Sequence, residues 1–151
     1  MSIFHSFNIS ASALTAQRLR MDVTAANIAN AQTTRATINE NGEVEPYRRR
    51  MVAFQPDGKP FKHFLHKAIT HRERLTGGVK VAGIVYDREP FKLVYDPAHP
   101  DANEEGYVRY PNVDPLKEMV DLMSATRSYE ANITALNASK DMLLKALEIG
   151  K

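Results

Sequence analysis

Three histidines close together in the middle of the chain are the first candidates for chemistry. His63 and His66 are three residues apart, and His71 follows five residues later. On a helix, imidazoles at such spacings could bind zinc, with Glu73 as a further ligand. Basic side chains between the histidines would repel a divalent cation. They are Lys62, Lys67, Arg72 and Arg74. We therefore interpret this stretch as a solvated basic segment, keep a zinc enzyme as the alternative, and expect no metal or cofactor.

A run of three arginines is the second candidate. Arg48, Arg49 and Arg50 follow Tyr47, and basic residues beside an aromatic ring are typical of nucleic-acid binding. On a strand, however, successive side chains point to opposite faces, so the run cannot line one groove. The formal net charge of +2 does not demand a polyanionic partner. Because arginine also pairs with protein carboxylates, we favour a subunit contact or a solvated strand, with nucleic-acid binding as the alternative.

No motif of a catalytic site stands out. Gly77 and Gly78 lack the further glycines and the downstream lysine of a phosphate loop, and they favour a turn. No serine has the setting of a nucleophile elbow, and no pair of carboxylates differs from ordinary surface acids. The chain has no cysteine, which excludes disulfides, thiol catalysis and thiolate metal sites. The sequence gives no support to an enzyme.

The most regular pattern lies near the N-terminus. Phe7, Leu14, Met21 and Ile28 recur every seven residues and predict a helix over residues 3–33 with one narrow apolar seam. Its end is rich in Asn and Thr, which bond to nearby backbone and compete with helix continuation. Arg18 falls in this seam.

A longer seam runs along the C-terminal end. Asp114 and Pro115 are a good start signal, and Gly150 is a plausible stop, so we expect a helix over residues 115–149. Apolar residues follow one another there at three- and four-residue steps. The main ones are Met119, Leu122, Ile133, Leu136, Leu143 and Leu147. Thr126 and Lys140 are polar seam residues, which either extend to water at the edge of the stripe or specify register.

The segment between the helices reads as strands and loops. Residues 46–54, 79–85 and 91–95 have strand patterns, Asn41 and Gly42 predict a turn, and residues 96–103 an exposed loop. The predicted fold class is α+β, with long terminal helices pairing as an antiparallel coiled-coil stalk and a small central β-rich segment. The predicted domains are residues 1–35, 36–110 and 111–151. Long, thin helices leave apolar faces for neighbouring copies, so we expect an assembling subunit.

The 151 residues, with a mass of 17.0 kDa, fit one small domain on a helical stalk. No window approaches the apolar length of a membrane span, and the start lacks the pattern of a cleavable signal. We therefore expect a protein that stays in the cytoplasm or leaves by a route without signal cleavage.

Several short motifs resemble one known family. Residues 22–34 are similar to the N-terminal signature of the bacterial flagellar rod and hook family, with Asn27, Ile28, Ala29, Asn30 and Thr33 as its motif residues. Further motifs look like the proximal rod members of that family. They lie at residues 46–50, 78–84, 94–100, 106–108, 111–114 and 127–132. One departure is residues 43–45, Glu-Val-Glu, where the family pattern has small, glycine-rich residues.

The resemblance implies a structural subunit of the flagellar basal body, a part of the rod that transmits torque for motility. It implies export by the flagellar type III apparatus without signal cleavage, and assembly in the periplasm. The implied partners are further copies, other proximal and distal rod proteins, the adaptor at the export gate and membrane ring, and the rod-capping protein, with no nucleic acid and no membrane insertion. The alternatives are another axial rod or hook component, or a small basic nucleic-acid-binding domain.

The resemblance also assigns roles to residues. In this family the terminal helices form the assembly layer, so the seam residues of both helices are the expected assembly contacts. The segment from Tyr47 to Arg50 and the loop after residue 95 are the expected lateral contacts. The lateral candidates are Tyr47, Arg48, Arg49, Arg50, Tyr95, Asp96, Pro97, Tyr107 and Asn112.

Overall fold

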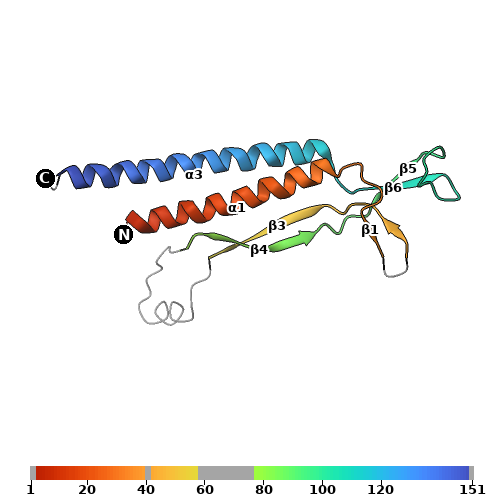
Figure 1. The fold of residues 1–151 in the computed structure, drawn as a ribbon, viewed down its shortest axis with the longest axis horizontal. Coiled ribbons are helices and arrows are strands. Elements are labelled where there is room, and N and C mark those ends of the chain that lie inside the picture. Colours follow the sequence, from red (N-terminus) through yellow and green to blue (C-terminus); the bar gives the residue numbers. More distant parts are fainter. Residues whose placement is uncertain (1–2, 40–41, 58–76, 150–151) are drawn as a thin grey trace, which may run out of the picture. The chain divides into compact units, whose positions relative to one another are not determined.

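The computed structural model describes residues 3–39, 42–57 and 77–149, and it has the predicted α+β composition (Figure 1). The elements in chain order are α1 (Ile3–Ala29), β1 (Thr37–Ile38), β2 (Val44–Glu45), β3 (Arg50–Pro56), β4 (Val79–Tyr86), β5 (Lys92–Tyr95), β6 (Tyr107–Tyr110) and α3 (Pro115–Ile149). The three histidines and Asn41 lie outside the described residues, so the zinc alternative is not tested by the structure.

The chain forms two compact units, each built from separate segments. Unit 1 comprises Met1–Leu19, Ala53–Gly83 and Ala125–Lys151, and unit 2 comprises Arg20–Val52 and Ile84–Ser124. Helices α1 and α3 and strands β3 and β4 each contribute residues to both units. No helix in the described ranges is long and apolar enough to cross a membrane.

Helix α3 has the predicted bounds, and its start has the predicted cap. The Asp114 carboxylate accepts a hydrogen bond from the backbone N–H of Leu116 at 3.1 Å, and the Asp114 carbonyl accepts one from Glu118 N–H at 3.0 Å. Pro115 takes the first helical position, where a missing N–H costs nothing because that N–H has no partner inside the helix. Local sequence signals therefore define this helix boundary.

One face of α3 is withdrawn from water, and it follows a heptad pattern. The residues on it are buried or half-buried and alternate at steps of four and three. They are Glu118, Leu122, Ala125, Tyr129, Asn132, Leu136, Ser139 and Leu143. Half of this series is polar or small, so a search for large apolar residues finds only part of it.

Other apolar residues of α3 are exposed to solvent. Met119, Ile133 and Leu147 of the predicted seam are 49%, 37% and 71% exposed, whereas Leu122, Leu136 and Leu143 are half-buried. Leu116, Val120 and Met123 are also exposed and lie on the same side as Met119. The helix thus carries two stripes, a partly polar one that is withdrawn from water and an apolar one that is exposed.

Helix α1 ends at Ala29, four residues before the predicted end at Thr33. The Asn30 side chain donates a hydrogen bond to the Ala26 carbonyl at 2.9 Å, and the Thr33 carbonyl accepts one from Tyr47 N–H at 3.0 Å. Ala31 N–H bonds to the Ile28 carbonyl, three residues back, and the Thr33 carbonyl is taken by Tyr47, so the regular helical bonding does not continue. The predicted competition from Asn and Thr side chains therefore ends the helix before residue 33.

The predicted α1 seam is half-buried rather than fully buried. Phe7, Leu14, Met21 and Ile28 all have intermediate exposure. The most buried positions of this helix carry small or polar side chains. They are Ser10, Ala16, Val23, Thr24 and Asn27. Close packing on small residues therefore replaces the expected contact of large apolar side chains.

The six strands form three two-stranded sheets, β1–β2, β3–β4 and β5–β6. The predicted strands correspond to β3, β4 and β5, although β3 begins four residues later than expected. In β5–β6 the antiparallel register pairs Lys92 with Tyr110 and Tyr95 with Tyr107. Gly42, with φ of 79°, turns the β1–β2 hairpin as predicted. Strands β1, β2 and β6 were not expected, and β1 and β2 are only two residues long, too short to show alternation.

Few large apolar side chains are buried. Among the described residues, the buried apolar ones are Ala16, Val23, Tyr47, Val108, Val113 and Ala125. As many polar side chains are equally buried, namely Ser10, Thr24, Asn27, Asn112, Glu118 and Ser139. Hydrogen bonds and ion pairs therefore carry much of the specificity that an apolar core would supply in a larger domain.

Gly78 marks a close approach between the start of β4 and helix α1 inside unit 1. A Cβ atom on Gly78 would overlap Ser12 Oγ and lie 2.8 Å from Ser12 Cβ. The Ser12 hydroxyl also accepts a hydrogen bond from Val79 N–H at 3.1 Å. The glycine pair does not form the predicted turn. It leads into β4, and Gly78 is small so that the strand can reach the helix.

Replacing Gly78 by Ala should lower the free energy of unfolding by about 1–3 kcal/mol, because Ser12 or the strand must move. Gly83, in β4, is the matched control, since a Cβ atom added there would meet nothing within 4 Å and Gly83→Ala should be nearly neutral. Urea unfolding of both variants measures this. Equal midpoints for the two variants would contradict the close approach.

Candidate functional site

Glu118, in the first turn of α3, is the centre of a buried polar cluster in unit 2. Its side chain is only 2% exposed, yet it is a carboxylate. Its oxygens accept hydrogen bonds from Asn27 Nδ2 at 2.9 Å and from Arg49 Nε at 2.6 Å. A buried charge is tolerated only when it is paired and hydrogen-bonded, and both conditions are met here.

Asn27, near the end of α1, uses its whole hydrogen-bonding capacity in this cluster. Its Nδ2 group donates to Glu118 and to the Arg50 carbonyl at 2.8 Å. Its Oδ1 atom accepts from the Tyr47 hydroxyl and from Arg50 N–H, both at 3.0 Å. An amide has two donors and two acceptor positions, so no polar atom of this side chain is left unpaired. Asn27 therefore ties α1 to α3 and to the start of β3.

Arg49 brings the positive charge to the cluster. Its guanidinium group is 12% exposed, binds Glu118, and contacts Asp87 Oδ2 at 3.1 Å and Asp121 Oδ2 at 3.6 Å. Burial alone would lower the pKa of Arg49, but hydrogen bonds to Glu118 and Asp87 outweigh burial and raise the pKa above its ordinary value. The arginine thus stays charged and holds three carboxylates, two of them on α3.

Asp87 binds the guanidinium group of Arg49, and Asn112 binds its backbone N–H. Backbone N–H of Glu89 and the side chain of Arg49 bind the Asp87 carboxylate and lower its pKa, against a smaller opposing effect of burial. Asn112 accepts from Arg49 N–H at 2.8 Å and donates to the Glu89 carbonyl at 3.1 Å. We call Asn27, Tyr47, Arg49, Asp87, Asn112 and Glu118 the polar cluster.

The two neighbouring arginines lie over aromatic rings. The Arg48 guanidinium carbon is 4.4 Å from the centre of the Phe91 ring, and that of Arg50 is 5.5 Å from Tyr47 and 5.7 Å from Tyr86. These distances are typical of cation–π contacts. Arg48 and Arg49 both bind Asp87, Arg48 at its backbone carbonyl at 3.3 Å and Arg49 at its carboxylate. Their partners lie within the chain, so this run offers no ready phosphate-binding groove.

The structure separates the lateral candidates into two groups. Tyr47 and Asn112 are buried and Arg49 is almost so, and all three bind partners inside unit 2. Arg50, Pro97 and Tyr107 are exposed, as is Tyr95, whose ring meets Tyr107 edge to face at 5.3 Å. Arg48 and Asp96 have intermediate exposure. A contact with another subunit is therefore open to the second group and not to the first.

The sequence identified several members of the cluster but not their connection. Asn27 stood out as a motif residue, and Tyr47, Arg49 and Asn112 as contact candidates. Glu118 and Asp87 were not among the candidates. One signal in the sequence could have revealed the cluster. Glu118 continues the four- and three-residue spacing of the buried face of α3, and a buried carboxylate needs a cation as its partner.

The chemistry of the cluster is structural. The Asn27 amide is saturated, Glu118 already accepts two hydrogen bonds, and Arg49 is enclosed by carboxylates, so these groups are not free to attack or protonate a substrate. Within the described ranges, no group of three or more His, Asp or Glu residues is arranged to hold a metal ion. The cluster joins both long helices to the β segment.

Comparison with known proteins assigns the chain to a class. Residues 7–37 match the family described as "Flagella basal body rod protein", and residues 104–149 match "Flagellar basal body rod FlgEFG protein C-terminal". These two regions contain most of α1 and all of α3. The two regions that match flagellar rod families therefore correspond to the two long helices of the structure.

Full-length relatives narrow the class. The chain is 61% identical over 151 residues to the flagellar basal-body rod protein FlgC of Bacillus subtilis, and 43% identical over 151 residues to FlgC of Salmonella typhimurium, with 100% of each chain covered. It is 44% identical over 160 residues to FlgC of Borreliella burgdorferi, covering 99% of this chain and 98% of the relative. The chain belongs to the FlgC family of flagellar basal-body rod proteins, which are structural proteins.

Loss of the Arg49 charge should destabilise the protein strongly. Arg49→Met keeps most of the side-chain volume but leaves Glu118 buried without its cation, which should cost about 3 kcal/mol or more. Arg48→Met is the matched control, because Arg48 contacts a ring rather than a buried carboxylate, and its loss should cost about 1 kcal/mol or less. Urea unfolding gives both values. Similar losses of unfolding free energy for the two variants would show that the ion pair of Arg49 with Glu118 contributes no more than the contact of Arg48 with its ring.

Acid should weaken the cluster through Asp87. Because its pKa is lower in the folded than in the unfolded protein, Asp87 stabilises the fold above its unfolded pKa of about 3.9, and the effect is lost as the pH falls through the lower folded pKa. Asp87→Asn should therefore be less stable than the parent at neutral pH.

The pH series itself is the test. The difference in urea midpoint between Asp87→Asn and the parent should shrink as the pH drops below about 4. Asp141→Asn, at an exposed position of α3, should show a difference near zero at every pH. A difference for Asp87→Asn that does not change with pH would exclude this role of the carboxylate.

Proposed function

We propose that this protein is a structural subunit of the flagellar basal-body rod and assembles through its terminal helices into the axial drive shaft that transmits torque. The observation that carries the proposal is its 61% identity over its whole length to a FlgC protein. The proposal includes a place in the proximal rod, coiled-coil pairing of α1 with α3, and packing of both helices against neighbouring subunits.

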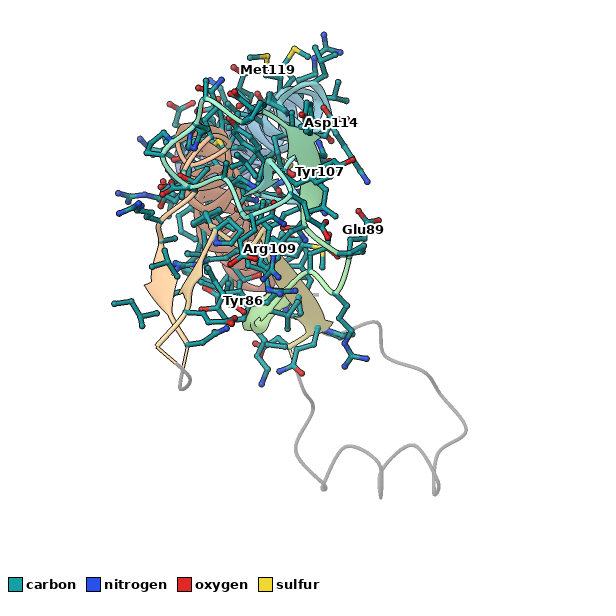
Figure 2. All side chains as sticks on the ribbon, turned by 90° about the vertical axis from the view of Figure 1, so that its right-hand side faces the viewer. Tyr86, Glu89, Tyr107, Arg109, Asp114 and Met119 are labelled. Carbon is teal, nitrogen blue, oxygen red and sulfur yellow. The ribbon has the colours of Figure 1, made fainter. Side chains whose placement is uncertain are left out.

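The two stripes of α3 support an assembly role. The first stripe, from Glu118 to Leu143, is buried or half-buried within the chain. The second stripe is exposed, with Leu116, Val120 and Met123 at 75%, 61% and 56% (Met119 is labelled in Figure 2). Exposed apolar stripes on a long helix are typical of helices that pack against other molecules. A helix with one covered and one open stripe suits a subunit in a helical layer.

Contacts between α1 and α3 in unit 2 support the pairing. Asn27 binds Glu118, and Arg20 binds Asp121 with 3.2 Å between Nη2 and Oδ1. The two bonds join residues that are 91 and 101 positions apart in the sequence. They hold the C-terminal part of α1 against the N-terminal part of α3, as antiparallel pairing of the two helices requires.

We further propose that the protein leaves the cell through the flagellar type III apparatus without signal cleavage and assembles in the periplasm. Its partners would be further copies, other proximal and distal rod proteins, the adaptor at the export gate and membrane ring, and the rod-capping protein. This part of the proposal rests on membership of the family, and the exposed apolar and charged surfaces of the chain are the contact sites it would use.

Replacing Leu136 by Asp should abolish rod completion and swimming in a strain whose own gene is deleted. Leu136 lies in the half-buried stripe of α3, and a carboxylate there would be withdrawn from water without a cation. Asn137→Asp, a substitution at the neighbouring exposed position, is the control and should leave swimming unchanged. Motility in soft agar and electron microscopy of basal bodies measure the effect. Normal swimming of Leu136→Asp would count against assembly through this helix.

A further inference from the structure

A groove in unit 2 lies apart from the polar cluster. Its volume is about 370 Å³, and residues of the β1–β2 hairpin, the loop before β6 and β6 itself line it. Val44, Pro46 and Pro100 give it apolar walls, and Tyr107, Arg35 and Arg109 give it a ring and two cations. Tyr107 and Arg109 alternate on β6, so their side chains lie on one face of the strand (both are labelled in Figure 2).

The two cations of the groove differ in their pairing. Arg35 forms an ion pair with Asp101, whose carboxylate also accepts a hydrogen bond from the Thr34 hydroxyl at 2.8 Å. Arg109 is exposed and has no carboxylate partner within the described ranges. The groove therefore combines an anchored cation, an unpaired cation, an apolar wall and one exposed carboxylate, that of Glu43. The unpaired cation beside the apolar wall suits a peptide segment that carries a carboxylate.

The chain itself presents such a segment at the tip of the β5–β6 loop. Glu104 and Glu105 are adjacent and exposed, and neither side chain forms an ion pair within the described part of the chain. The Asn103 side chain accepts hydrogen bonds from Glu105 N–H at 3.1 Å and from Tyr107 N–H at 2.7 Å. Gly106 completes the turn with φ of 81°.

This geometry makes the tip a rigid acidic projection. Side chains on a loop held by its own hydrogen bonds lose little conformational freedom on binding. Several other carboxylates of unit 2 are occupied, because Asp87, Glu118 and Asp121 bind Arg49 and Asp101 binds Arg35. The two adjacent carboxylates of the tip are a ready complement to Arg109.

We propose that the groove between the β1–β2 hairpin and β6 binds the Glu104–Glu105 tip of a second copy of this chain, with Arg109 as the cation. The contact is heterologous, because the groove of one copy takes the tip of the next, and such contacts propagate around a ring or along a helix. The inference rests on the proposed function, since a rod places copies next to one another. It adds a lateral contact that is independent of the terminal helices.

Disulfide cross-linking tests the contact directly, because the chain has no cysteine of its own. Val44→Cys places a thiol in the groove, and Glu105→Cys places one at the tip while Glu104 keeps its charge. Both variants are expressed together in a strain whose own gene is deleted, and basal bodies are oxidised. A disulfide-linked dimer is expected. Arg88→Cys, exposed and outside the groove, replaces the groove cysteine in the control and should give none.

Charge reversal supplies the second measurement. Arg109→Glu or Glu104→Arg alone places like charges in the contact, and each should reduce the swimming zone about twofold or more. Expressed together, the two variants can alternate so that every groove meets a tip of opposite charge. Swimming should then recover. Recovery in the mixture requires a contact between copies, because a contact inside one chain would stay mismatched in both variants.

The outcomes separate this inference from the proposed function. If the parent gene restores swimming but the groove and tip cysteines form no dimer, or the mixture does not recover, the groove contact is overturned and the rod function stands. If the parent gene itself fails to restore swimming to the deleted strain, the proposed function is overturned and the contact with it.

Discussion

The pairing of a buried carboxylate with a half-enclosed arginine is the interaction on which the rest of unit 2 depends. Glu118 sits at 2% exposure, and Arg49 neutralises it while also holding Asp87 and Asp121. Without that cation, the first turn of α3 could not lie against the end of α1, because an isolated charge would have to leave water. The end of α1, the first turn of α3, the start of β3 and the turn after β4 all meet at this point.

The scarcity of large buried apolar groups explains why a polar joint has this importance. Small residues such as Ala16, Val23 and Ala125 allow close approach but bury little apolar area. Directional bonds of Asn27 and Asn112 then define which segments meet. Much apolar surface is left exposed on α3 and on the strand pairs, as in a molecule that buries its remaining surface against other subunits.

The sequence predicted the α+β class, the bounds of α3 and the approximate place of three strands, because those features follow from local signals. Asp114 and Pro115 define a helix start by themselves, and alternating residues define β4. Only part of the buried face of α3 was predicted, because Glu118, Asn132 and Ser139 place polar side chains at its heptad positions. The two-residue strands β1 and β2 have no periodicity to detect. The polar cluster joins residues up to 91 positions apart, and no local pattern encodes such a pairing.

The place of Glu118 along the chain has a consequence for the order of folding. Asn27 and Arg49 lie in the first third of the sequence, but their shared anion comes after residue 110. A chain that emerges from a ribosome or a narrow channel with its N-terminus first therefore exposes these two side chains to water until most of its length has passed. The joint can therefore close only after the first turn of α3 has emerged.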